Sequence, residues 1–169
     1  DAWPRYILVL MFLFVFTRLF DPMSDGVCLA KGDLLDMRKV LKSMYALTVC
    51  QFVFLLPFEG ALAAILFMAC GIPSDALPYL LSVYCGQSLL FMAIGHFLRQ
   101  TVLTQHLISG LLLACGMMIP GVFLYAAFLD SLIRGSINAI HVGVLLAWQI
   151  SLAGLFPFIS FLVSVHLTE

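Results

Sequence analysis

The sequence of 169 residues has few charged side chains: eight are basic, nine are acidic, and together they make up 10% of the chain. A soluble domain carries roughly 25% charged residues, so this composition excludes an ordinary water-soluble protein. The net charge of -1 provides no basic surface of the kind that binds nucleic acid, and we exclude that class of partner. Hydrophobic residues make up 63% of the chain, which indicates several membrane-spanning segments.

Sequence patterns of catalytic and metal sites are also missing. The chain has no GxxxxGKS/T motif, so it is not expected to bind a nucleotide through a P-loop. The five cysteines form no CxxC pair, which argues against a zinc site and a disulfide framework and favours buried cysteines that pack as small hydrophobic residues. No Ser/His/Asp set and no carboxylate pair has a usable spacing, so we expect no enzyme active site and no cofactor bound by this chain.

The apolar residues run continuously instead of alternating, which favours helices over a β-barrel. The sequence predicts one domain, residues 1–169, with an all-α fold: a polytopic membrane helical bundle with about five transmembrane helices and one amphipathic interfacial helix. Turns are expected at Gly71–Ser74 and at Arg99–Thr101. The predicted spans are residues 6–20, 43–70, 77–98, 102–128 and 140–167.

One segment, residues 18–44, holds about half of the charged side chains of the chain. Its residues 21–42 are predicted to form a loop on the inner side of the membrane, because Lys and Arg are retained on the side that is not translocated. The N-terminus is then expected outside, and the loop faces the cytoplasm or the mitochondrial matrix. The charged residues of the segment are Arg18, Asp21, Asp25, Lys31, Asp33, Asp36, Arg38, Lys39 and Lys42.

Within this loop, Leu34, Met37, Leu41 and Met44 recur at the spacing of one helical face. They predict a short amphipathic helix over residues 33–44 that lies along the inner membrane surface. Its basic residues would lie toward its C-terminal end, where the helix dipole favours cations. Two interpretations remain open: a surface anchor with ordinary positive-inside charges, or a docking surface for a soluble partner.

The stretch RLFDPMSDGVCLAKGDLLDMRKVLKSM, residues 18–44, resembles the corresponding loop of the cytochrome c maturation permeases, which are CcmB-type members of the ABC-2 permease class. Thr17 and Ala30 stand where that family usually has acidic residues, and the first transmembrane helix of the family has no counterpart here. Residues at similar spacing include Arg18, Leu19, Phe20, Asp25, Gly26 and Leu29, and further along Leu55, Leu56, Pro57, Gly71, Gly86, Gly95, Ile119, Pro120 and Pro157.

The resemblance implies a membrane permease subunit of an ABC-type complex that supports haem delivery in cytochrome c maturation. Its partners would be an ATP-binding subunit and a haem-handling membrane protein, so ATP and haem would be bound only through partner subunits. Pairing of two copies in a homodimer is a further expectation. Together with the amphipathic pattern, the resemblance suggests a surface that couples the ATPase to membrane-helix motion: Asp25, Gly26, Leu29, Leu34, Met37 and Leu41.

The missing first helix favours a second hypothesis: a non-catalytic structural membrane subunit of a larger respiratory or organellar complex, derived from such a permease. Either hypothesis places the chain in the bacterial plasma (inner) membrane or the mitochondrial inner membrane, as a multi-pass protein. An unrelated channel or small-solute carrier built on an intramembrane acid stays open as a third.

That acid is Glu59, which lies inside the predicted span 43–70. An ionisable group at membrane depth is expected to face protein or a water-filled cavity. It could bind a proton, a cation or a partner helix; the alternative is a protonated carboxyl hydrogen-bonded to a neighbouring helix.

The four histidines are the candidate haem ligands. His96, His106 and His166 are expected near the inner ends of their spans and His141 near an outer end. No two of them are therefore expected to ligate haem at mid-membrane.

Overall fold

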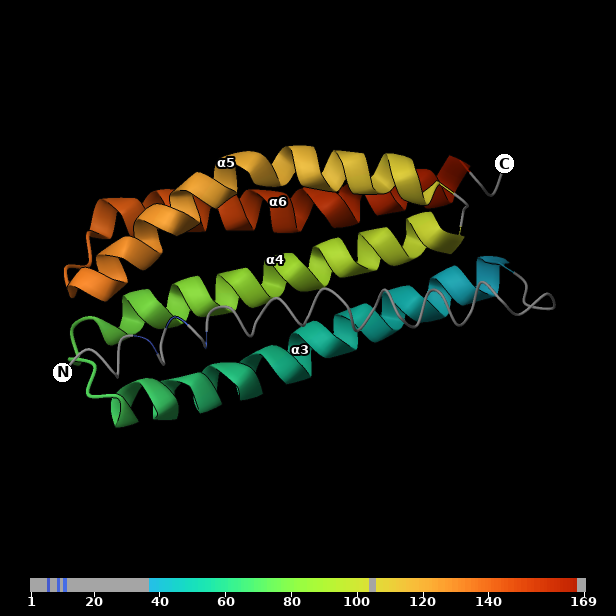
Figure 1. The fold of residues 1–169 in the computed structure, drawn as a ribbon. Helices are drawn as coiled ribbons and strands as arrows, with labels where there is room; N and C mark the ends of the chain where they lie inside the picture. Colours follow the sequence, from blue (N-terminus) through green and yellow to red (C-terminus); the bar gives the residue numbers. More distant parts are fainter. Residues whose placement is uncertain (1–5, 7–8, 10, 12–36, 104–105, 167–169) are drawn as a thin grey trace.

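The computed structural model describes residues 6, 9, 11, 37–103 and 106–166. This part of the chain contains no β-strand and four long helices: α3 (Met37–Ala69), α4 (Leu77–Leu103), α5 (Leu107–Arg134) and α6 (Ala139–His166). The helices alternate in direction along the chain (Figure 1). The end of α3, the start of α4, the end of α5 and the start of α6 therefore meet at one end of the bundle. We call this the Gly71 end and the opposite end the Arg99 end.

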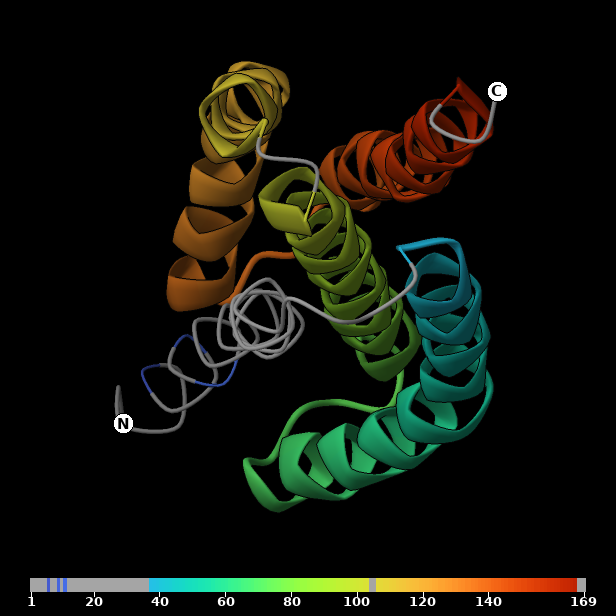
Figure 2. The same cartoon turned by 90° about the vertical axis from the view of Figure 1, so that its right-hand side faces the viewer.

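Helix α4 is at the centre of the bundle, where it packs against α3, α5 and α6 (Figure 2). Between Gly86 and Thr101 nearly every residue of α4 is buried, with Leu89 and His96 half-buried. This burial follows from the central position of α4, whose three neighbouring helices pack against it. The large side chains with less than 2% exposure include Phe67 on α3, Phe91 on α4, Phe128 on α5 and Phe156 on α6.

The outer surface of the bundle is also apolar. Ile108, Phe123 and Ile140, for example, are 76%, 72% and 73% exposed. Three helical segments in the described part of the chain are long and apolar enough to cross a membrane: Leu77–Val102, Leu107–Arg134 and Ala139–Val163. A surface of this kind is compatible with lipid and not with water. The described part of the chain is therefore all-helical, as predicted, and three of its helices are suited to a membrane; the five spans predicted from the sequence stay a prediction.

The predicted turn at Arg99–Thr101 is wrong. Helix α4 continues to Leu103, and α5 runs from Leu107 to Arg134 instead of over 102–128. Arg99, Gln100 and Thr101 are 4%, 7% and 9% exposed, respectively. Polar residues indicated a loop in the sequence, but the bundle buries them inside a helix because neighbouring groups satisfy them.

The start of α3 also differs from the prediction. Residues 37–42 were assigned to the inner loop and to a separate surface helix, yet they belong to one helix that continues to Ala69. No glycine or proline occurs between Met37 and Leu56, so nothing in the sequence interrupts the helix there. Arg38, Lys39 and Lys42 consequently lie in the N-terminal part of a long helix, where the helix dipole does not favour cations. Pro57 lies inside α3, and Figure 2 shows that the helix bends along its length.

The predicted turn after α3 is confirmed. Gly71 has a φ of 75°, and the amide of Ile72 donates a hydrogen bond of 3.2 Å to the carbonyl of Phe67. This is the geometry of a helix that ends at a left-handed glycine. The first predicted span, 6–20, is described only at Tyr6, Val9 and Met11, which are helical; the rest of it lies outside the described residues.

Candidate functional site

The predicted intramembrane acid, Glu59, lies on the face of α3 that packs against the bundle. Glu59, Ala63 and Phe67 follow one another at intervals of four residues and are 8%, 1% and 0% exposed. The hydroxyl of Ser88 on α4 donates a hydrogen bond of 2.7 Å to Oε2 of Glu59. The carboxyl group therefore faces protein, as expected for an ionisable group at this depth.

A second polar contact joins α4 to α6. The amide Nε2 of Gln149 donates a hydrogen bond of 2.5 Å to Oε1 of Gln87, and the two residues are 0% and 2% exposed. Gly86 makes room for this pair, because a Cβ atom at that position would be 2.5 Å from Oε1 of Gln149. That oxygen is buried and accepts no hydrogen bond in the described part of the structure. The pair is thus held by packing against a glycine as well as by its own hydrogen bond.

The two contacts lie at the same depth. Glu59 is ten residues before the end of α3, Gln87 and Ser88 are ten and eleven residues after the start of α4, and Gln149 is ten residues after the start of α6. At 1.5 Å per residue this is about 15 Å from the Gly71 end, half of a hydrocarbon core of about 30 Å. We call these four residues the polar layer. It connects α3, α4 and α6.

The polar layer holds neighbouring helices together through hydrogen bonds between their side chains. Interhelical hydrogen bonds in membranes contribute about 0.6–2 kcal/mol each. Cys85 lies beside the layer, since a Cβ atom on Gly60 would be 3.3 Å from its sulfur. Among the described residues, no three His, Cys, Asp or Glu side chains are grouped to hold a metal ion.

Another group of polar residues lies toward the Arg99 end. Nε2 of Gln100 donates a hydrogen bond of 2.8 Å to the carbonyl of Ser160 on α6, and the hydroxyl of Thr101 donates one of 2.7 Å to the carbonyl of Leu98. Arg99 is buried beside them. The Gln100 contact attaches the end of α4 to the second half of α6, whereas the Thr101 contact is local to α4.

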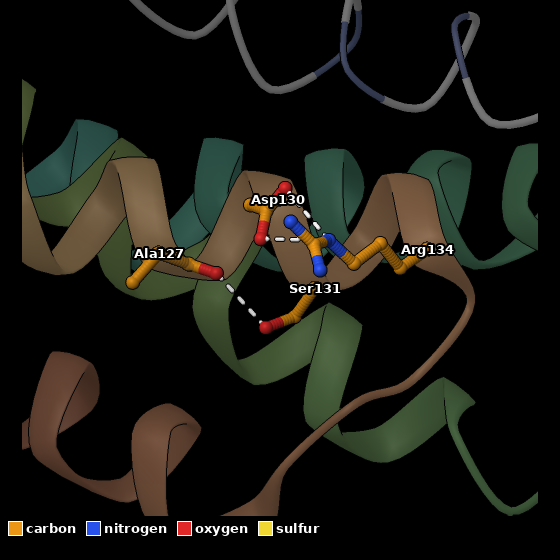
Figure 3. Close-up of polar contacts among 4 residues, drawn as sticks. All are labelled: Ala127, Asp130, Ser131 and Arg134. Carbon is orange, nitrogen blue, oxygen red and sulfur yellow. Dashed lines mark hydrogen bonds and ion pairs between the residues drawn. The ribbon is translucent and has the colours of Figure 1, made fainter.

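The Gly71 end carries exposed polar groups instead. Arg134 forms an ion pair of 3.0 Å with Asp130, one helical turn earlier on α5 (Figure 3). The hydroxyl of Ser131 donates a hydrogen bond of 2.9 Å to the carbonyl of Ala127, as Figure 3 also shows. These interactions are local to α5 and join residues that are one helical turn apart.

The histidines are distributed as the sequence predicted. His96 on α4 and His106 before α5 lie toward the Arg99 end, and His166 ends α6 there, whereas His141 is exposed at the Gly71 end. The cysteines differ from the prediction, because Cys50 and Cys115 are exposed on the outside of the bundle instead of buried. An apolar outer surface in lipid accommodates a thiol as readily as the core does.

Most of the residues proposed to couple the ATPase cannot be placed in the structure. Asp25, Gly26, Leu29 and Leu34 lie outside the described residues. Met37 and Leu41 belong to the first turns of α3 as described, and thus to the same helix as Glu59.

The sequence interpretation missed Gln87, Ser88 and Gln149. A usable signal was present, because each is a polar residue near the middle of a long apolar run. Polar residues at such positions are expected to hydrogen-bond across helices. The sequence alone could not show which of these residues contact one another, since that depends on the rotation of each helix about its axis.

Comparison of the chain with known protein families, with characterised proteins and with solved structures gives no significant match. Its function is therefore argued from its own residues.

Proposed function

We propose that this chain is a membrane permease subunit, without an active site of its own, of an ABC-type complex that supports haem delivery in cytochrome c maturation. It would have five transmembrane helices, would reside in a bacterial plasma membrane or a mitochondrial inner membrane, and would work with an ATP-binding subunit and a haem-handling membrane protein. Segment 21–42 would bind the ATP-binding subunit. The proposed contact residues are Asp25, Gly26 and Leu29, together with the apolar face formed by Leu34, Met37 and Leu41.

The observation that best supports this proposal is the continuity of α3. One helix runs from Met37, inside the proposed contact segment, through Glu59 in the polar layer and on to Ala69. A displacement of the contact segment would therefore be transmitted along one continuous helix, through the bend near Pro57, to Glu59.

The test is affinity purification of the full chain in mild detergent, comparing the wild type with an Asp25→Lys variant and with an Asp130→Lys variant as a matched surface control. The proposal predicts that an ATPase subunit co-purifies with the wild type and the control and is lost from Asp25→Lys, while all three insert equally into the membrane. Unchanged recovery of the ATPase with Asp25→Lys, or its absence from the wild type, would contradict the proposal.

A structural subunit of a larger respiratory or organellar complex is the second candidate. One observation favours it: the polar groups of the polar layer form contacts between helices of this same chain, as a scaffold requires. The same purification distinguishes the two, because a scaffold would bring respiratory subunits and no ATPase.

A further inference from the structure

Helix α3 is longer than the helix it packs against, and in Figure 1 its start extends past the end of α4. The hydrogen bond between Ser88 and Glu59 sets these two residues at the same level. The candidate membrane span of α4 ends at Val102, fourteen residues or about 21 Å from Ser88. From Glu59 back to Met37, α3 continues for twenty-two residues, which is about 33 Å. The first turns of α3 therefore project past the end of this span.

The projecting turns carry three basic residues, Arg38, Lys39 and Lys42, which we call the basic arc. Lys42 follows the other two by four and three positions, so the three positions are neighbours on the helix surface. They span an arc of about 100° around the helix axis. Met37 and Leu41 fall on a different side of the same turns. The basic positions are thus gathered on one side of the projecting helix.

We propose that the basic arc binds the headgroup phosphates of anionic phospholipids in the membrane leaflet at the Arg99 end. Its positions are about 26–32 Å from Glu59 along α3, and hence about 5–10 Å past the end of the α4 span. The headgroup region occupies about 5–8 Å on each side of the hydrocarbon core. Because α3 bends near Pro57, its reach along the membrane normal is shorter than its length, which keeps the basic arc at the level of the headgroups.

Charge complementarity supports a lipid phosphate as the occupant. Among the described residues, the Arg99 end carries the basic arc and no acidic residue, whereas the Gly71 end carries Asp75, Asp130 and Arg134. Asp33 and Asp36 precede the arc in the sequence and lie outside the described residues; with both counted, this part of the sequence is still net positive. Anionic lipids attract Lys and Arg residues that lie near the membrane surface. A bound phosphate would also offset the unfavourable interaction of these cations with the dipole of α3.

Native mass spectrometry of the full chain in mild detergent, titrated with phosphatidylglycerol or with phosphatidylcholine of the same acyl chains, tests the proposal. The wild type is expected to bind phosphatidylglycerol roughly tenfold more tightly or better, and the triple variant Arg38→Gln, Lys39→Gln, Lys42→Gln should lose this preference. Arg134→Gln removes one cation at the Gly71 end and should keep it. Equal affinity of the wild type for the two lipids, or an undiminished preference in the triple variant, would overturn the proposal.

Two measurements on the wild type do not depend on the folding of a variant. The amount of phosphatidylglycerol retained during purification from mixed bilayers should fall as the salt concentration rises, whereas retained phosphatidylcholine should not change. Retention of phosphatidylglycerol that salt does not affect would contradict binding through the basic arc. Inorganic phosphate at the concentration of the lipid should not displace it; displacement would show that the ligand is a free anion and would overturn the lipid assignment. No ATP-binding subunit takes part in these measurements, so failure here leaves the proposed function untouched.

Discussion

Gln149 of α6 and Gln87 of α4 share a hydrogen bond of 2.5 Å between two side chains that are almost completely buried. Because Ser88, the next residue of α4, bonds Glu59 of α3, adjacent positions of one helix hold two different neighbours. The centre of the bundle is therefore held by polar contacts in surroundings that are otherwise apolar. Lipid provides no hydrophobic force between helices, so such contacts and close packing decide how the helices associate.

Replacing Gln149 by Leu is expected to destabilise the protein by about 1–2 kcal/mol, because Gln87 is left buried without its partner. Replacing both residues by Leu should cost less than the sum of the single variants, since no polar group then remains unsatisfied. Thermal unfolding in mild detergent measures all three. A double variant that is additive would show that the glutamines do not interact.

Removal of the hydroxyl at Ser88 should cost about 1 kcal/mol, through loss of its hydrogen bond to Glu59. The matched control is Ser82→Ala, on the same helix, because the Ser82 hydroxyl is exposed and donates its hydrogen bond to the carbonyl of Pro78, one turn earlier on the same helix. Unfolding of the two variants under identical conditions makes the comparison. Equal stability of Ser88→Ala and Ser82→Ala would show that the contact between α3 and α4 contributes little.

Gly121→Ala should be strongly destabilising, because the added Cβ would overlap the indole ring of Trp148 on α6. Overpacking of this kind costs about 1–3 kcal/mol. Gly116→Ala on the same helix is the control: among the described residues, no atom outside the adjacent backbone of α5 lies within 4 Å of its Cβ position, so the change should be neutral or slightly stabilising. Shortening Trp148 to Leu in the Gly121→Ala variant should recover part of the loss. Without such recovery, the close approach of α5 and α6 at this point would be in doubt.

Arg134→Gln should change stability by less than about 0.5 kcal/mol, despite the good geometry of its ion pair with Asp130. The two side chains are 72% and 59% exposed, so solvent screens their attraction. A loss near that of the buried polar contacts would indicate that a partner or ordered headgroups cover this end of the bundle. Unfolding measured at low and at high salt separates these cases.

The sequence predicted the helices well and their contacts poorly. Continuous apolar runs and the turn at Gly71 are local features, so helices near 43–70, 77–98 and 140–167 could be placed from the chain alone. The polar stretch Arg99–Thr101 suggested a turn. Its burial could not be predicted locally, because it depends on groups far along the chain such as the carbonyl of Ser160. The separate surface helix over 33–44 was inferred from an apolar periodicity that a longer helix shares.

Only part of the candidate site was predicted, because local features can be recognised in the sequence and contacts between helices cannot. Glu59 was recognised because an acid in an apolar run is costly wherever the helix points. Its hydrogen-bond donor, Ser88, and the glutamine pair could not be chosen from the sequence, since their meeting depends on helix rotation and on the missing side chain at Gly86. Segment 21–42 remains a prediction as a contact surface, argued from the resemblance and from its continuity with α3.

The side of the membrane that segment 21–42 occupies tests the central claim most directly. Cys28 is a natural probe within it, and a variant with Cys50, Cys70, Cys85 and Cys115 replaced by Ala leaves it as the sole thiol. A membrane-impermeant maleimide applied to sealed vesicles of both orientations should label Cys28 only from the side that holds ATP. Labelling only from the opposite side would contradict a role for this segment as the contact of an ATPase.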